Sequence, residues 1–149
     1  MIENNDRFKM VVSAYLVLIK SGKVLLSKRY QTGWQDGNYG LPAGHVEDQE
    51  TVSMALVREA SEEIGIKIDS KDVKYLHTMH RECGGYERID IFFTAKKWEG
   101  EIINNEPEKC DDLSWFSLKK LPKNIIPYIK SAINDCAKGI NYSEFGWKK

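Results

Sequence analysis

Residues 44–66 read GHVEDQETVSMALVREASEEIGI and carry the densest pattern of the 149-residue chain. Apolar side chains recur at helical spacing over residues 51–64, so this part predicts an α-helix. Glu59, Glu62 and Glu63 stand at positions i, i+3 and i+4 of that helix. Side chains at this spacing lie close together on one face. The segment therefore predicts a helix that carries three neighbouring carboxylates.

These carboxylates do not take the face on which solvated charges normally lie. At about 100° per residue, they continue the apolar stripe that Val52, Ala55 and Leu56 begin. Three like charges within one turn repel each other, and the last half of a helix disfavours anions. Either this is an ordinary charged helix face or a bound cation offsets the charge. Hard oxygen ligands without cysteine favour Mg²⁺ or Mn²⁺ over Zn²⁺.

The same segment fits a longer signature: Gly, five residues, Glu, seven residues, Arg-Glu, an aliphatic residue, any residue, Glu-Glu, any residue, Gly and an aliphatic residue. The matching positions are Gly44, Glu50, Arg58, Glu59, Glu62, Glu63, Gly65 and Ile66. This signature is the Nudix box, and on it the chain resembles the Nudix hydrolase family. Only Ala60 is smaller than the usual aliphatic residue. A pattern with nine fixed positions is far more specific than a short glycine-rich motif.

The resemblance implies an α+β fold, a Nudix-type α/β/α sandwich with a mixed β-sheet. It also implies that the segment binds Mg²⁺, with Mn²⁺ as an alternative, and hydrolyses a nucleoside diphosphate linked to another group. The implied metal ligands are the Gly44 carbonyl, Glu59, Glu62 and Glu63, and the implied catalytic residues are Arg58, Glu59, Glu62 and Glu63. Glu62 would be a further ligand or the base. Arg58 and Glu50 would form a structural pair that orients the catalytic carboxylate.

Residues 40–47 and 106–115 are similar to the MutT-like nucleoside-triphosphate diphosphatases, especially the sanitising type that accepts modified guanine nucleotides. This similarity implies hydrolysis of a nucleoside triphosphate to a nucleoside monophosphate and pyrophosphate. Two alternatives stay open: a hydrolase of ADP-ribose or another nucleoside diphosphate derivative, and a non-catalytic nucleotide-binding Nudix module. The first loses ground because residues 67–84 contain no proline, which ADP-ribose-cleaving members tend to show past the box.

The resemblance also indicates site residues outside the helix. Glu106 is a candidate metal ligand or base supplied from a loop, or else a solvated loop acid. Arg29 resembles a phosphate contact, because a guanidinium suits phosphate, although it could be a surface cation. His45 could hydrogen-bond the phosphate or sugar of the substrate. Tyr39 is a candidate for stacking on the base, with Phe93, Trp115 and Tyr128 as further candidates, although aromatic residues in strands are more often core.

Glycine and proline divide the rest of the chain into short elements without a linker, so we expect a single domain over residues 1–149. The predicted strands are 8–19, 23–30, 73–80, 86–98 and 113–116, and the predicted helices are 51–64 and 125–137. The first two strands should form a hairpin across Ser21–Gly22. Gly65 and Gly139 mark the expected ends of the helices. Strands outnumber helices, which favours a mixed sheet with helices packed on it.

Charge and composition limit the partners. The chain has 22 Lys and Arg against 22 Asp and Glu, so no global basic field favours a long nucleic acid. The longest apolar run, residues 10–19, is too short to cross a bilayer, and we expect no membrane partner. Three widely spaced cysteines indicate a reducing cytoplasm rather than a disulfide framework. The expected partner is a small-molecule nucleotide, and a homodimer stays open.

Overall fold

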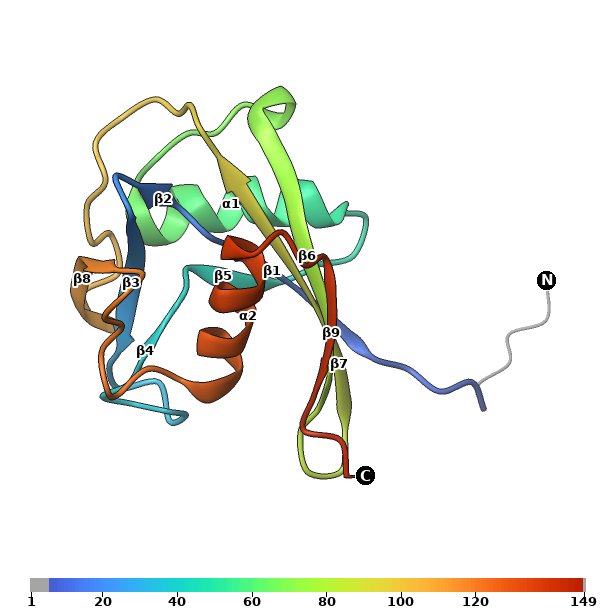
Figure 1. Ribbon diagram of the computed structural model, residues 1–149. Helices are drawn as coiled ribbons and strands as arrows, with labels where there is room; N and C mark the ends of the chain where they lie inside the picture. Colours follow the sequence, from blue (N-terminus) through green and yellow to red (C-terminus); the bar gives the residue numbers. More distant parts are fainter. Residues whose placement is uncertain (1–5, 149) are drawn as a thin grey trace.

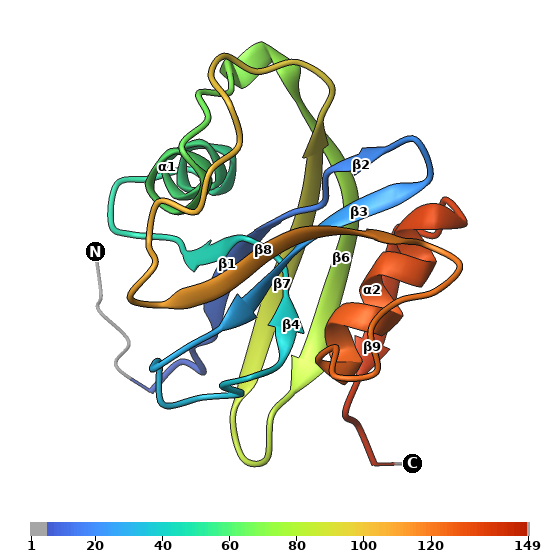
Figure 2. The same ribbon diagram turned by 90° about the vertical axis from the view of Figure 1, so that its left-hand side faces the viewer.

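Two β-sheets lie between two α-helices in the computed structural model, which describes residues 6–148 (Figures 1 and 2). The helices are α1 (Val52–Ile64) and α2 (Pro127–Ala137), with a short 3₁₀ turn η1 (Ser70–Asp72) between α1 and the next strand. This arrangement confirms the expected α/β/α sandwich. The ends of the predicted domain, residues 1–5 and 149, lie outside the described residues.

The larger sheet has five strands in the order β5-β1-β7-β6-β9. Their bounds are β1 (Val11–Leu16), β5 (Ala43–His45), β6 (Val73–Glu82), β7 (Glu87–Ala95) and β9 (Tyr142–Phe145). The pairs β1–β7 and β6–β9 are parallel and the other two pairs are antiparallel, so the sheet is mixed as predicted.

The smaller sheet is built around β3 and is wholly antiparallel. Its bounds are β2 (Ile19–Lys20), β3 (Lys23–Arg29), β4 (Tyr39–Gly40) and β8 (Cys110–Ser117). The turn between β2 and β3 is formed by Ser21 and Gly22, which both have positive φ. Two such residues are what a tight hairpin turn requires, so the predicted hairpin is confirmed.

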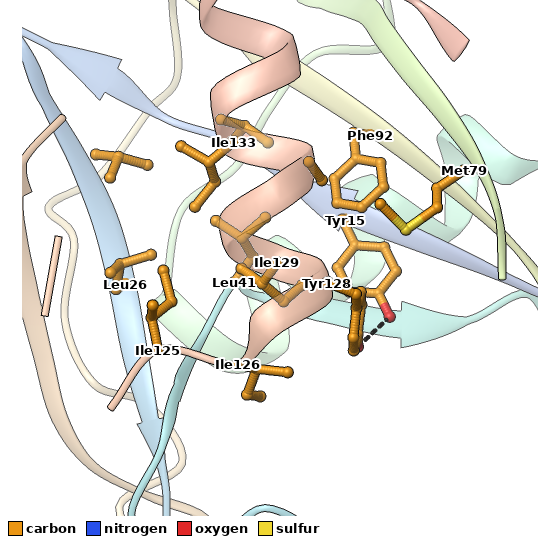
Figure 3. Packing of buried hydrophobic residues seen from close by; sticks show 13 residues of the cluster. Tyr15, Leu26, Leu41, Met79, Phe92, Ile125, Ile126, Tyr128, Ile129 and Ile133 are labelled. Carbon is orange, nitrogen blue, oxygen red and sulfur yellow. Dashed lines mark hydrogen bonds between the residues drawn. The ribbon is translucent and has the colours of Figure 1, made fainter. Parts of the chain in front are cut away.

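The chain segment 14–18 explains why the protein has one core on each side of the sheets. Tyr15 and Val17 pack in the cluster around α2, whereas Ala14, Leu16 and Leu18 pack in the cluster around α1. Successive side chains of a strand point to opposite faces, so a continuously apolar run is buried on both sides. Figure 3 shows the α2 side, where the hydroxyls of Tyr15 and Tyr128 lie 2.9 Å apart.

Helix α1 begins and ends where local signals place its ends. The Thr51 side chain caps the helix by accepting a hydrogen bond from the Met54 amide at 3.1 Å. Gly65 adopts the left-handed conformation with φ of 71° and donates its amide to the Ser61 carbonyl. A Cβ at Gly65 would also lie 2.8 Å from Cγ1 of Ile103. Both the conformation and the lack of space therefore require glycine at this position.

The strand bounds differ from the prediction at several places. The single strand predicted over 8–19 is divided into β1 and β2, because the chain crosses from one sheet to the other at residues 17–18. The strand predicted at 113–116 is part of the longer β8, and β9 was not predicted at all. Neither helix in residues 6–148 is long and apolar enough to cross a membrane.

Candidate active site

The carboxylates of α1 line one cleft together with residues from two loops. This acidic cleft has a volume of about 800 Å³, and its acidic residues include Glu59, Glu62 and Glu63 of α1 and Glu106 of the loop before β8. Gly44 of β5 also lines the cleft, next to Glu59. Arg29 and His45 line the same cleft. The structure thus places all the predicted metal ligands in the lining of one cavity, together with Arg29 and His45. Residues that do not line it are Arg58 and the aromatic candidates Tyr39, Phe93, Trp115 and Tyr128.

Arg58 of α1 lies beside the cleft and joins the helix to the segment that carries His45 and Glu50. Its Nε and Nη2 donate to the two carboxylate oxygens of Glu50, at 2.8 and 3.0 Å. Nη2 also donates to the His45 carbonyl at 3.1 Å, and Nη1 donates to Glu59 at 2.6 Å. Together with the Glu47 amide, Arg58 lowers the pKa of Glu50 to about 2. A bidentate contact of this kind fixes the guanidinium, which in turn fixes the Glu59 carboxylate.

Gly44 leaves the space that the Glu59 side chain occupies. A Cβ added at this position would overlap the Glu59 carboxyl group and its Cγ. Gly44 pairs with Ala14 of β1 in the sheet, so its backbone cannot easily move away. Any larger residue at this position would therefore displace Glu59.

Glu63 is the most deeply placed carboxylate of the cleft. One of its oxygens accepts a hydrogen bond from the Ala43 amide at 2.9 Å. Burial, followed by the charge of Glu59, raises the pKa of Glu63 to about 8. Burial also raises the pKa of Glu59, although Arg58 opposes this effect. Glu62 is different, because 53% of its side chain is exposed. The inner end of the cleft therefore holds carboxylates that a cation would stabilise.

The donor chemistry of the cleft fits a hard divalent cation. Carboxylate and backbone carbonyl oxygens are the ligands that Mg²⁺ and Mn²⁺ prefer. In the arrangement of residues 6–148, however, no three His, Cys, Asp or Glu side chains stand close enough together to hold an ion. Glu59 is engaged by Arg58, and Glu63 by the Ala43 amide. The ligand atoms of the cleft are therefore of the kind that a divalent cation prefers. The Glu59 and Glu63 side chains must shift for the cleft to hold such a cation.

The loop that carries Glu106 is fixed across the C-terminal end of α1. The Asn105 amide donates to the Glu63 carbonyl at 3.0 Å, and the Asn105 side chain donates to the Glu62 carbonyl at 3.1 Å. These contacts satisfy helix carbonyls that have no partner within the helix. They also place Glu106 at the cleft although it lies more than 40 residues from the helix in sequence.

A second cavity, which we call the inner pocket, adjoins the acidic cleft. It has a volume of about 300 Å³ and shares Arg29, Ala43, Gly44 and His45 with the cleft. The Arg29 side chain donates to the Trp34 carbonyl at 2.7 Å and stands 4.9 Å from the centre of its ring. An extended molecule could therefore lie in both cavities at once, with Arg29 and His45 near their junction.

His45 is held as a hydrogen-bond acceptor at this junction. Its Nε2 lies 2.9 Å from Nη1 of Arg88, which can only donate. Burial and the charge of Arg88 lower the pKa of His45. The imidazole is therefore neutral, with its proton on Nδ1.

The aromatic candidates separate into two groups. Tyr39 lines neither cavity, because its hydroxyl donates to Asp112 and its ring packs against Phe116. Phe93 and Trp115 pack against the core around α1. Tyr128 does line the inner pocket, and its ring centre lies 6.4 Å from that of Trp34. The predicted substrate contact of Tyr39 stays untested, and its position does not support it.

Several residues of the inner pocket were not predicted from the sequence. They are Ser13, Arg81, Tyr86 and Arg88, with Asp90 behind Arg81. No motif marks these residues. The signal that could have revealed two of them is the strand period, because Arg81 and Asp90 occupy the same alternating buried positions as Met79 and Phe92.

Comparisons with known proteins show the family to which the chain belongs. The model of the NUDIX domain matches residues 8–136. An 8-oxo-dGTP diphosphatase of Proteus vulgaris is 30% identical over 101 residues, which cover 68% of this chain and 88% of that protein. The NAD-capped RNA hydrolase NudC of Pseudomonas aeruginosa is 32% identical over 107 residues, or 72% of this chain and 36% of that protein.

A crystal structure of a MutT NUDIX hydrolase from Burkholderia pseudomallei superimposes with a TM-score of 0.77 and 27% identity, covering 85% of this chain and 97% of that one. The chain therefore belongs to the NUDIX domain family. Within it, the chain is a MutT-like Nudix pyrophosphohydrolase.

Proposed function

We propose that the protein hydrolyses a nucleoside triphosphate to a nucleoside monophosphate and pyrophosphate in a Mg²⁺-dependent reaction in the cytoplasm. The observation that carries this proposal is the junction of the acidic cleft with the inner pocket at Arg29 and His45. The carboxylates suit a metal-bound phosphate chain, and the pocket suits the nucleoside. Relatives named 8-oxo-dGTP diphosphatase support this substrate class, with an oxidised purine nucleotide as one member.

In this proposal Glu59, Glu63 and the Gly44 carbonyl would hold the metal, with Glu62 and Glu106 as further candidate ligands. When bound, Mg²⁺ would neutralise phosphate oxygens and lower the pKa of a water molecule. Arg58 keeps the Glu59 carboxylate in place through the contact at 2.6 Å. Arg58 thus positions the Glu59 carboxylate, and the metal ligands would in turn position the phosphate chain and the attacking water.

The proton of the attacking water passes to a carboxylate in the cleft. Glu62 is suitable because it is the most exposed glutamate of α1 among the three, and Glu106 is the alternative. As the new bond between the water oxygen and phosphorus forms, the bond from that phosphorus to the departing pyrophosphate breaks. Arg29 and His45 would contact the phosphate chain or the sugar near the junction of the two cavities.

A second candidate is the hydrolysis of ADP-ribose or another nucleoside diphosphate derivative. The observation in its favour is the similarity to a NAD-capped RNA hydrolase, although this chain covers only 36% of that protein. A non-catalytic nucleotide-binding module is the third. All three candidate functions use the same cleft, so the products of the reaction distinguish them and the residues of the site do not.

The test is a phosphate-release panel with Mg²⁺, using canonical and oxidised nucleoside triphosphates, ADP-ribose and dinucleoside polyphosphates. The triphosphates are assayed with and without added pyrophosphatase, and ADP-ribose and the dinucleoside polyphosphates with and without alkaline phosphatase, because their hydrolysis produces phosphate monoesters and no pyrophosphate. Our proposal predicts a signal that appears only with pyrophosphatase and only for triphosphates. Turnover confined to ADP-ribose or dinucleotides would favour the second candidate. Binding without turnover of any compound would favour the third.

A further inference from the structure

Arg81 of β6 lies at the bottom of the inner pocket as a buried cation. Only 9% of its side chain is exposed, and it is one of the residues that line the pocket. Its Nε donates to Asp90 of β7 at 2.7 Å, and its Cζ lies 3.7 Å from the centre of the Tyr128 ring. The guanidinium is therefore held by two contacts: the hydrogen bond to Asp90 lies along one of its edges, and the Tyr128 ring lies against its centre.

The remaining donors of Arg81 are available to a ligand. A guanidinium carries five N–H groups in a rigid arrangement. Within residues 6–148, the hydrogen bonds of Arg81 involve Nε alone, which leaves the four N–H groups of Nη1 and Nη2. Neither nitrogen is among the buried unpartnered atoms of the described residues, so both reach the surface of the pocket and can donate to a molecule that offers acceptors.

The lining of the inner pocket is rich in donors and has no carboxylate. Arg29 and Arg88 line it along with Arg81, whereas Asp90 is fully buried behind the guanidinium. Ser13, which also lines the pocket, has a buried hydroxyl oxygen that makes no hydrogen bond in the described part of the chain. The Trp34 and Tyr128 rings supply apolar walls. The pocket is thus complementary to a flat group whose inner edge carries acceptors.

We propose, on the basis of the function proposed above, that Arg81 is a specificity-determining residue that recognises the acceptor edge of the nucleobase. Two acceptors side by side, such as a ring nitrogen and an exocyclic carbonyl oxygen, match a guanidinium in bidentate fashion. Purines with an exocyclic carbonyl beside N7, such as guanine and hypoxanthine, are favoured. Adenine and 2,6-diaminopurine place an amino group there and are disfavoured. Asp90 is a positioning residue that holds the guanidinium.

The experiment compares substrates that differ in this one edge. We would measure kcat/KM for ITP against ATP and for GTP against 2,6-diaminopurine nucleoside triphosphate, with wild type and Arg81→Lys. The wild type should favour the carbonyl member of each pair roughly 5- to 150-fold, the range of a good bidentate contact. Arg81→Lys keeps the charge but loses the two-pronged geometry, so both ratios should fall to within about threefold of unity.

Binding of the products supplies a readout that does not depend on turnover. Calorimetric Kd values for IMP and AMP should show the same preference in the wild type and its loss in Arg81→Lys. A second variant, Arg81→Met with Asp90→Asn, removes both charges together and avoids a lone buried carboxylate. It should lose the preference as well, and circular dichroism would confirm its fold.

Arg88→Lys is the matched control, because Arg88 lines the same pocket but is only partly buried. It should change kcat/KM for both members of a pair by the same factor. If the wild type cleaves triphosphates without preferring the carbonyl bases, or if Arg81→Lys retains the preference, this inference is wrong and the proposed function stands. If nothing is cleaved but IMP still binds better than AMP through Arg81, the proposed function is wrong and the inference stands.

Discussion

Arg58 donates to both carboxylate oxygens of Glu50, at 2.8 and 3.0 Å, and so joins the segment before α1 to the helix itself. The same guanidinium contacts Glu59 at 2.6 Å. Arg58 and Glu50 therefore act without touching the substrate, because they fix the orientation of Glu59, a proposed metal ligand. Its removal should affect the chemistry without removing a group that touches the substrate.

Glu50→Gln tests this relationship. The amide offers only one oxygen to Arg58 and no charge, so Glu59 loses its fixed partner. We expect kcat to fall by roughly 10- to 100-fold, as for other residues that support metal ligands, with a smaller change in KM. Glu47→Gln is the control, because Glu47 lies 3.8 Å from Arg58 and is largely exposed. Equal activity of Glu50→Gln and wild type would contradict the positioning role.

The same pair gives stability a pH dependence. The pKa of Glu50 is lowered to about 2, below the ordinary value of about 4.3. A lowered carboxyl pKa stabilises the fold above the ordinary value, and this contribution is lost as pH falls from about 4.5 towards 2. In urea unfolding, wild type should exceed Glu50→Gln in stability at pH 7, with the difference shrinking over that window. A difference that stays constant down to pH 2 would argue against the contact.

Glu63→Gln should remove activity while the fold is retained. The amide is similar in size and its oxygen can still accept from the Ala43 amide, so packing is preserved. It cannot serve as a charged metal ligand, and we expect kcat/KM to fall by at least about 100-fold. The metal-free variant should unfold at the same temperature as the wild type or higher, since the wild type must bury a carboxyl group whose pKa is raised to about 8, and the amide removes the cost of protonating it. Near-normal turnover would show that the site is wrongly assigned.

Gly44→Ala should disturb the same site through direct overlap with Glu59. The new Cβ would overlap the Glu59 carboxyl group, so the side chain must move. We expect a higher Mg²⁺ concentration for half-maximal rate and a lower kcat, with a small change in unfolding temperature. Glu59→Gln supplies the comparison, because it removes the ligand charge without adding volume. An unchanged Mg²⁺ dependence in Gly44→Ala would mean that Glu59 takes no part in holding the metal.

Local signals in the sequence predicted α1 and its carboxylates well. Thr51 and Gly65 determine where the helix begins and ends through contacts within four residues, and such contacts are visible in the sequence. The hairpin at Ser21–Gly22 is equally local. The alternating burial of residues 14–18 follows from the strand period, so the two-sided core could be inferred once the sandwich was expected.

Contacts between distant parts of the chain could not be predicted in the same way. The Glu106 loop reaches the cleft through the bonds of Asn105 to the end of α1, and no sequence spacing encodes them. Strand β9 is short, and its place beside β6 depends on the whole sheet. Arg81 was missed because the predicted strand ended at His80, one residue before the buried cation.

The most direct test of the account is to identify the products of a triphosphate by ³¹P NMR, with Mg²⁺ present, removed by EDTA and then restored. We predict equal amounts of nucleoside monophosphate and pyrophosphate with Mg²⁺, no turnover with EDTA, recovery on restoration, and no turnover by Glu63→Gln. Formation of nucleoside diphosphate and inorganic phosphate, or turnover that persists without a divalent metal, would contradict the proposed reaction.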